Sequence, residues 1–344
     1  MAKHRTLRRV LAAAAFLLLA GLLLALAGRV LRPAQESYGS TWRAYRAEPE
    51  DTMDVLYFGS SYAYCDFDPV EIYRNSGLTG YVMAGSEQTM SITYWYLREA
   101  LETQSPQAVV IEPTGVFFER YQQYTQTNLV YMPPSLNKLG AIFTAAEPEL
   151  RVGLLWDLWF YHSRWKEVGP ADVRKAFTPA APDQRKGFTP VAGTAEELTL
   201  TQNPRPLSPE QYAENLQWLL RCLELCEARG IQAVLLINPT YSQCSPEQYR
   251  QLEADVAAAA PEVRFYNWAN SFEALGLTPE EHLYDGGHLN GEGAAVYARG
   301  VAALLTEELG LVPMEQTAEN AAASHGAGAG PDRAPPGQEK NTPR

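Results

Sequence analysis

Cysteine is scarce in this 344-residue chain, and the four residues present do not form a metal-binding pattern. No two of them have C-x-x-C spacing and no histidine lies near them, whereas zinc sites are built from such clusters. We therefore expect no metal site, and no other motif implies a cofactor. Cys222 and Cys226 lie one turn apart on a predicted helix and Cys244 follows the next strand, so the sequence is compatible with one disulfide outside the cell and equally with buried free thiols.

Positive charge is also in short supply. The chain has 28 Lys and Arg against 40 Asp and Glu, a formal charge of −12, and six of the basic residues fall within residues 1–32, which contain no acid. The remaining body has a charge of −18 and repels phosphate backbones, so we expect no nucleic-acid partner. With 46% hydrophobic and 20% charged residues, the composition is that of a globular protein and excludes wholesale disorder, collagen-like repeats and a disulfide scaffold.

One long run without charge does occur, from Val10 to Gly28. Its length approaches the ~30 Å hydrocarbon thickness of a bilayer when helical, so it predicts a single membrane-spanning helix. More basic residues precede the run than follow it, which places the N-terminus in the cytoplasm and the body outside the cell membrane. The alternative is a cleaved signal peptide with Ala25-Leu26-Ala27 at the cleavage site. We favour the anchor because the run exceeds the ~7 to 15 apolar residues of a usual signal core.

The chain divides into three parts by composition. Residues 1–32 form the cytoplasmic basic stub and anchor, residues 33–314 form the folded domain, and residues 315–344 are rich in Ala, Gly, Pro and polar residues, which predicts a disordered tail.

Short apolar runs alternate with helical stretches through the domain. The runs lie at Val55–Phe58, Gly80–Met83, Ala108–Ile111, Ala233–Ile237 and Val263–Tyr266. Continuous apolar runs separated by helices indicate strands buried on both faces of a parallel sheet. Capping boxes at Ser208–Gln211 and Ser245–Gln248 each open a helix, and residues 291–308 form a last one. The fold class is therefore α/β, a three-layer α/β/α sandwich with a five-stranded parallel sheet.

About 90 residues separate the third and fourth predicted strands, at about 115–206, far more than a crossover needs. This segment is predicted to be a helical, aromatic-rich insertion that forms a lid or side-lobe near the carboxyl edge of the sheet. Within it, His162, Arg164 and Trp165 form an aromatic-basic cluster that could contact a glycan or an anionic head group. Such a cluster more often packs a lobe together.

Candidate catalytic residues follow the strands, where open α/β sheets bind their ligands. The first strand runs into Gly59-Ser60-Ser61, a small-residue turn that exposes a hydroxyl and a backbone N–H, and either serine could be the nucleophile. The second ends at Gly85, whose N–H could approach a substrate oxygen. Before the last helix, Asp285 and His288 are three residues apart, a spacing that lets the carboxylate orient an imidazole toward a serine.

These blocks resemble those of the SGNH (GDSL-like) hydrolases over roughly residues 54–310, outside the insertion. The resemblance implies an SGNH, flavodoxin-like fold with Ser61 as nucleophile, His288 as base, Asp285 as its orienter, and the N–H groups of Ser61 and Gly85 as oxyanion donors. The third block departs from the pattern, because Glu112-Pro113-Thr114-Gly115 contains no asparagine.

A tethered body with a GSS turn and a D-x-x-H-L-N ending is also similar to the extracytoplasmic branch that includes the DltD-type and alginate O-acetylation proteins. This second resemblance implies work with a membrane-bound O-acyltransferase on a glycan or glycopolymer. We therefore expect an exported serine esterase or O-acyltransferase that forms an acyl-serine. The alternatives are a non-catalytic glycan-binding or scaffold protein on the same fold and a plain secreted lipase or carbohydrate esterase.

Overall fold

The computed structural model describes residues 2–33, 41–196, 198, 207–241 and 246–314. At its centre is a single five-stranded sheet in the order β2-β1-β3-β4-β5, in which every neighbouring pair is parallel. The strands are β1 Val55–Gly59, β2 Gly80–Ala84, β3 Ala108–Ile111, β4 Gln232–Ile237 and β5 Arg264–Asn267. The predicted fold class is confirmed, with each strand within a residue or two of the expected run.

Alternate side chains of each central strand enter different apolar cores. In β1, Leu56 and Phe58 join one cluster of buried residues, while Val55 and Tyr57 join the other. All four side chains are almost completely buried, because helices cover both faces. Strand β5 differs from the expectation: it is an edge strand, and Arg264 and Asn267 at its ends are exposed.

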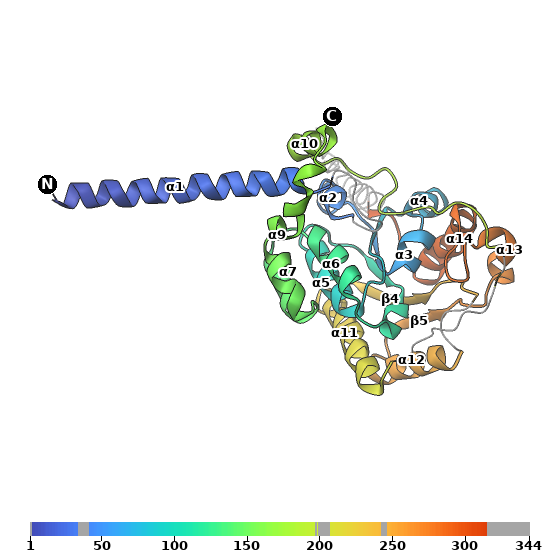
Figure 1. Cartoon of the computed structure of the whole chain (residues 1–344). Coiled ribbons are helices and arrows are strands. Elements are labelled where there is room, and N and C mark those ends of the chain that lie inside the picture. The colour runs from blue at the N-terminus through green and yellow to red at the C-terminus, as the bar shows by residue number, and fades with distance from the viewer. Residues whose placement is uncertain (1, 34–40, 197, 199–206, 242–245, 315–344) are drawn as a thin grey trace, which may run out of the picture.

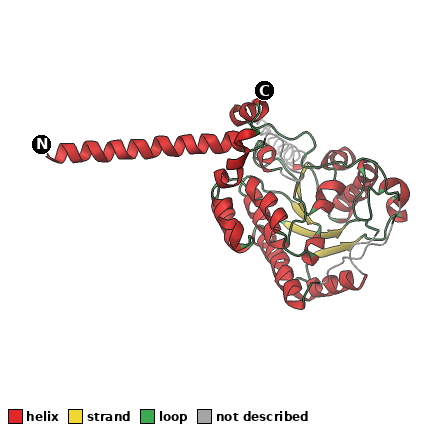
Figure 2. Ribbon diagram, viewed as in Figure 1, coloured by secondary structure: helices red, strands yellow, loops and turns green. Residues whose placement is uncertain are grey.

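Helices form a layer on each side of the sheet (Figures 1 and 2). The first core is closed by α5 (Met90–Ala100), α11 (Pro209–Ala228) and α12 (Pro246–Ala259), and the second by α3 (Ser61–Asp66), α4 (Pro69–Ser76) and α14 (Gly291–Ala303). Helix α14 continues as a π-helical turn over Leu304–Glu308. The short elements α2 (Trp42–Tyr45), α13 (Pro279–His282) and a 3₁₀ turn at Glu273–Leu275 complete the body.

The capping box predicted for α11 is present. Ser208 Oγ accepts from the Gln211 N–H at 3.2 Å, and Gln211 Oε1 accepts from the Ser208 N–H at 3.2 Å. Ser245, the predicted cap of the next helix, lies outside the described residues, as does Cys244. The cysteines Cys65, Cys222 and Cys226 are buried free thiols.

Helix α1 (Ala2–Leu31) projects from the body (Figure 1). An 18-residue window within its segment Arg5–Leu31 has a mean hydropathy of 2.8, and the segment is long and apolar enough to span a membrane or to be a signal sequence.

The insertion forms a helical side-lobe. Its helical elements are a 3₁₀ turn at Pro113–Phe117, α6 Gln122–Tyr131, α7 Leu136–Thr144, a 3₁₀ turn at Pro148–Leu150, α8 Arg151–Leu155, α9 Asp157–Tyr161, a 3₁₀ turn η3 at His162–Lys166, and α10 Pro170–Phe177. Helix α7 packs on α5, while α9, η3 and α10 pack on the body end of α1. The lobe therefore lies between the sheet domain and the apolar helix.

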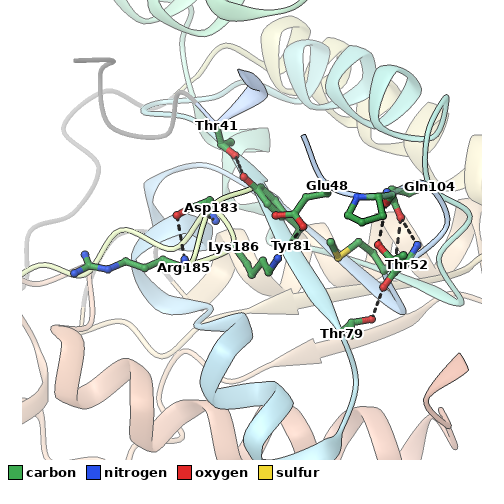
Figure 3. A network of polar contacts seen from close by, with 12 residues as sticks. Thr41, Glu48, Thr52, Thr79, Tyr81, Gln104, Asp183, Arg185 and Lys186 are labelled. Carbon is green, nitrogen blue, oxygen red and sulfur yellow. Dashed lines mark hydrogen bonds and ion pairs between the residues drawn. The ribbon is translucent and has the colours of Figure 1, made fainter. Parts of the chain in front are cut away.

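The end of the insertion returns along the edge strand β2 (Figure 3). The Val82 N–H donates to the Lys186 carbonyl at 2.9 Å, and Lys186 Nζ lies 2.7 Å from Glu48 Oε2. Ahead of Glu48, Thr41 Oγ1 donates to the Tyr81 hydroxyl at 2.8 Å. These contacts bring the segment after α1 and the end of the insertion to the same sheet edge.

Gly187 makes this approach sterically feasible. Its φ is +85°, and a Cβ there would lie 2.2 Å from the Val82 carbonyl oxygen. We predict that Gly187→Ala lowers the free energy of unfolding by about 1 to 3 kcal/mol more than Gly230→Ala, because overlap adds to the left-handed backbone cost. Gly230 is a matched control, since its φ is +68° and nothing lies within 4 Å of the position that a Cβ would take. Denaturant titrations of both variants measure the difference; equal losses would contradict the prediction.

Candidate active site

A tight strand-to-helix turn presents the first serine block. Strand β1 ends at Gly59, whose φ is +152° and whose added Cβ would lie 2.9 Å from the Cβ atoms of both Ala63 and Glu112. Only glycine allows β1 and α3 to approach this closely. Helix α3 then begins at Ser61, and the N–H of this first helical residue has no acceptor within the helix.

The two adjacent serines have different environments. Ser60 is fully buried, and its Oγ accepts from the Tyr62 N–H at 3.4 Å as the N-cap of α3. The Oγ of Ser61 lies 2.8 Å from His288 Nε2. Of the two candidates that the sequence left open, the structure therefore places Ser61 at the histidine.

Asp285 and His288 occupy a small turn before α14. The Leu283↔Leu289 bridge closes the turn, and Asp285 Oδ1 accepts from the N–H groups of Gly287 and His288 at 2.8 and 2.9 Å. The same carboxylate contacts His288 Nδ1, at 2.9 Å from Oδ1 and 3.0 Å from Oδ2. The backbone N–H groups of the loop thus hold the carboxylate in place. The carboxylate orients the imidazole so that Nε2 points at Ser61.

Aromatic packing and charge reinforce this orientation. The Tyr62 ring stacks on the imidazole with centroids 4.8 Å apart and planes at 19°. Burial works to raise the pKa of Asp285, but the hydrogen bond and charge of His288 together with the two N–H donors outweigh it and lower the pKa. Asp285 therefore stays ionised at neutral pH, as the orienting acid of a serine–histidine pair must.

A second carboxylate lies near the histidine. Glu87, two residues after Gly85, has an unusual φ of +46°. Burial raises its pKa, and the charge of His288 opposes that rise. The sequence did not reveal Glu87 as a site residue, because an acid in a loop after a strand has no distinguishing local pattern.

Gly85 adjoins the buried amide of Asn128 from α6. A Cβ at Gly85 would lie 1.9 Å from Asn128 Oδ1, so the glycine is needed for this contact. Asn128 Nδ2 donates to the Ser86 carbonyl at 3.0 Å, and the Tyr96 hydroxyl donates to the Asn128 carbonyl at 2.6 Å. The insertion thus positions the second block through one asparagine, a residue that the sequence did not reveal because it lies about 40 positions away.

The third block holds a buried acid in place of an asparagine side chain. Glu112 is 1% exposed; its Oε1 accepts from the N–H and hydroxyl of Thr114, and among the described residues no partner lies at its Oε2. Burial raises the pKa of Glu112 to about 7, although the Thr114 hydrogen bonds oppose the rise. This position therefore lacks the amide N–H₂ that an asparagine would supply.

A buried polar network holds the serine helix and the histidine turn together. Asp66, the last residue of α3, accepts from the Leu289 N–H at 2.9 Å and from Asn238 Nδ2 at 3.3 Å. Asn238, just after β4, also donates to the Tyr62 carbonyl at 2.8 Å and accepts from the Tyr297 hydroxyl at 2.8 Å. Neither Asp66 nor Asn238 was a predicted site residue.

The predicted substrate-binding cluster lies at the body end of α1, in η3. Arg164 donates to the Leu31 carbonyl and lies 3.5 Å from Asp172 Oδ1, while His162 Nδ1 is 2.6 Å from the Trp159 carbonyl. Trp165 is exposed, with Lys166 Nζ 5.2 Å from its ring centroid. No contact found among the described residues joins these three to Ser61, and substrate contact by them stays a prediction.

The assembled site has the parts that nucleophilic acyl chemistry requires. A hydroxyl lies at hydrogen-bond distance from an imidazole, the imidazole is oriented by an ionised carboxylate, and the nucleophile stands at the first residue of a helix, where its own N–H has no acceptor within the helix. Within the described part of the chain, no group of three His, Cys, Asp or Glu side chains is placed to hold a metal ion.

Comparison with known proteins yields structural similarities only. No family model and no curated protein matches the chain. Among solved structures, a "putative acylhydrolase" from Bacteroides fragilis NCTC 9343 is 12% identical with a TM-score of 0.39, over 80% of this chain and 100% of the other. A GDSL-like lipase from Bacteroides thetaiotaomicron VPI-5482 is 14% identical with a TM-score of 0.36, over 80% and 98%. Similarities this low carry no argument about activity, which is inferred below from the site itself.

The environment of Glu112 makes stability depend on pH. Because the folded pKa, about 7, exceeds the ordinary 4.5, the folded state holds a proton that the unfolded state releases as pH rises. Stability from this group is complete below pH 4.5 and is lost by about pH 7. We predict that the wild type loses up to about 3 kcal/mol relative to Glu112→Gln across this range. Denaturant titrations at several pH values measure it, and exposed Glu253→Gln should follow the wild type; a pH-independent difference between wild type and Glu112→Gln would refute the assignment.

Proposed function

We propose that this chain is an exported, membrane-tethered serine esterase or O-acyltransferase of the SGNH type that acts on an acylated cell-envelope glycan or glycopolymer. The observation that carries the proposal is the continuous contact from Asp285 through His288 to Ser61, at the carboxyl edge of a parallel sheet. Such edges are where open α/β folds bind their ligands.

The geometry supports a two-step acyl transfer. Ser61 Oγ attacks the acyl carbonyl carbon while His288 Nε2 accepts the hydroxyl proton, and the N–H groups of Ser61 and Gly85 stabilise the oxyanion. Collapse breaks the ester bond and the leaving alcohol takes the proton from His288. An acceptor hydroxyl, or water, then gives its proton to His288 and attacks the carbonyl carbon of the acyl-serine. The ester bond to Ser61 breaks, and Ser61 Oγ takes the proton back from His288.

The third block favours slow turnover of the acyl-enzyme, and we infer that an acceptor hydroxyl bound at the site directs it to transfer. Removing one oxyanion donor from a serine hydrolase costs about 2.7 to 4 kcal/mol of transition-state stabilisation, and Glu112 offers no amide in that position. An acyl-serine that reacts slowly persists long enough for an acceptor to bind before the acyl group is released. The insertion reaches the site through Asn128 of α6 and through Phe118, whose ring centroid lies 6.4 Å from that of Tyr62. Its end also contacts the serine helix, where the Thr189 N–H donates to the Tyr64 carbonyl at 2.7 Å, so these segments would limit water there.

The envelope location rests on α1. If α1 is a retained anchor, the site stays near the outer membrane–water interface, where a membrane-bound O-acyltransferase could supply acyl groups. Arg32 donates to the Val130 carbonyl at 3.4 Å and Lys175 donates to the Pro33 carbonyl at 2.9 Å, which ties the segment directly after α1 to the lobe. Both Arg32 and Pro33 follow the alternative cleavage site, so these bonds are compatible with either form. A mature N-terminus at Gly28 would contradict a retained anchor.

Covalent labelling tests the nucleophile. Because His288 contacts Ser61 and not Ser60, we predict that a fluorophosphonate labels the full-length protein at Ser61, and that Ser61→Ala abolishes labelling. Ser60→Ala, which removes only the helix cap, should retain the label while losing about 1 kcal/mol of stability. Peptide mass spectrometry locates the adduct. An unlabelled wild type with an intact fold would favour the alternative, a non-catalytic glycan-binding or scaffold protein.

An acceptor assay tests the acyl destination. With a chromogenic acetyl ester as donor, we predict slow release of the chromophore that oligosaccharide acceptors accelerate, and the acetyl group should appear as a new ester on the acceptor. His288→Ala should reduce turnover by at least about 10²-fold, because proton transfer by a positioned base contributes that much. Fast turnover that ignores every acceptor would identify a plain secreted lipase or carbohydrate esterase instead.

A further inference from the structure

A large cavity lies away from the serine, between the body end of α1 and the insertion. Its volume is about 1060 Å³, and its walls come from α1, α2, α7, α8 and the segment around α10. Pockets for small molecules commonly measure about 300 to 1,000 Å³, so this one can hold a ligand with a head group and part of an acyl chain.

The charge of the cavity is opposite to that of the protein. Six basic residues line it and none of its described lining residues is acidic, although the chain as a whole has a charge of −12. Four lie on four different helices and two directly follow α1 and α2: Arg29, Arg43, Lys138 and Lys175, then Arg32 and Arg46. A concentration of one charge against the net balance attracts a ligand of the opposite sign.

Of these cations, Arg29 and Arg43 have no carboxylate partner among the described residues. Arg43 donates to the carbonyls of Lys175 and Thr178, at 3.3 and 2.7 Å, and a carbonyl accepts a hydrogen bond without cancelling the charge. Arg46 has a carboxylate partner, Glu99, at 3.7 Å. Arg29 is exposed on α1.

The remaining walls are apolar and open to the surroundings. Leu136 is 85% exposed, and Leu139, Leu155 and Trp156, which line the same cavity, are also exposed. Single exposed apolar residues are ordinary, but a contiguous group marks a contact surface. Tryptophan and arginine together are typical of the interface between a bilayer and water.

We propose that this cavity binds an anionic phospholipid from the bilayer that α1 spans, with the phosphate among the arginines and an acyl chain against Leu136, Leu139 and Trp156. The location of the cavity favours a lipid over a soluble anion, because α1 forms one of its walls and the lipids around a membrane-spanning α1 would lie next to it. In this arrangement the insertion would hold the sheet domain at the membrane surface. This inference rests on a retained α1 but not on catalysis by Ser61.

Photocrosslinking in nanodiscs tests the site with the full-length chain. The probes are phosphatidylglycerol and phosphatidylcholine, each with the same photoreactive acyl chain, and peptide mass spectrometry maps the adducts. We expect phosphatidylglycerol adducts on α7 and around Trp156, several-fold above phosphatidylcholine, and no competition by water-soluble glycerol phosphate. Equal labelling by both lipids, or displacement by glycerol phosphate, would overturn the proposal.

Two double variants with the same change in net charge distinguish lipid binding in the cavity from attraction of anionic lipids by the overall charge of the protein. Arg29→Gln with Leu136→Glu alters two exposed cavity positions and should reduce phosphatidylglycerol labelling there by about tenfold. Arg74→Gln with Tyr73→Glu makes the same change on α4 and should leave labelling unchanged. Circular dichroism and thermal midpoints verify folding, and fluorophosphonate labelling reports the serine site separately. Equal loss in both variants, or adducts replaced by crosslinks to a second protein chain, would refute the lipid site.

Discussion

The buried carboxylate of Asp66 is the interaction on which the geometry of the site depends. It lies at one end of α3, with Ser61 at the other, and it accepts from the backbone N–H of Leu289, which directly follows His288. One six-residue helix therefore carries the nucleophile and fixes the segment that carries the base. A carboxylate without solvent is costly unless hydrogen bonds satisfy it, and burial does raise the pKa of Asp66 well above its ordinary value.

Asn238 extends this constraint to the sheet. Through its amide it contacts Asp66, the Tyr62 carbonyl and the Tyr297 hydroxyl, which connects β4 and α14 to the serine helix. Buried networks of this kind specify one arrangement, because any shift leaves a polar group without a partner. The 2.8 Å contact between Ser61 and His288, separated by 227 positions, is held by these neighbours rather than by either residue alone.

The insertion links the site to the apolar helix. Its α6 contributes Asn128 to the second block, while α9, η3 and α10 pack on α1. The lobe also forms part of the wall of the basic, apolar cavity beside α1, together with α2 of the body. If a bilayer surrounds α1, the lobe fixes how far the serine stands from its surface, which would restrict the substrates that can reach it.

The sequence by itself determined the fold class, the strand positions and the spacing of the catalytic candidates. These are local properties: apolar runs mark buried strands, Ser208 and Gln211 form a cap within one turn, and Asp285 reaches His288 across a short turn. Tertiary structure alone decided that Ser60 caps α3 while Ser61 faces His288, that β5 lies at an edge, and that Asn128, Asp66 and Asn238 support the site. Tertiary structure also decided that His162, Arg164 and Trp165 lie next to the body end of α1. Such outcomes depend on contacts between distant segments, which side-chain periodicity does not encode.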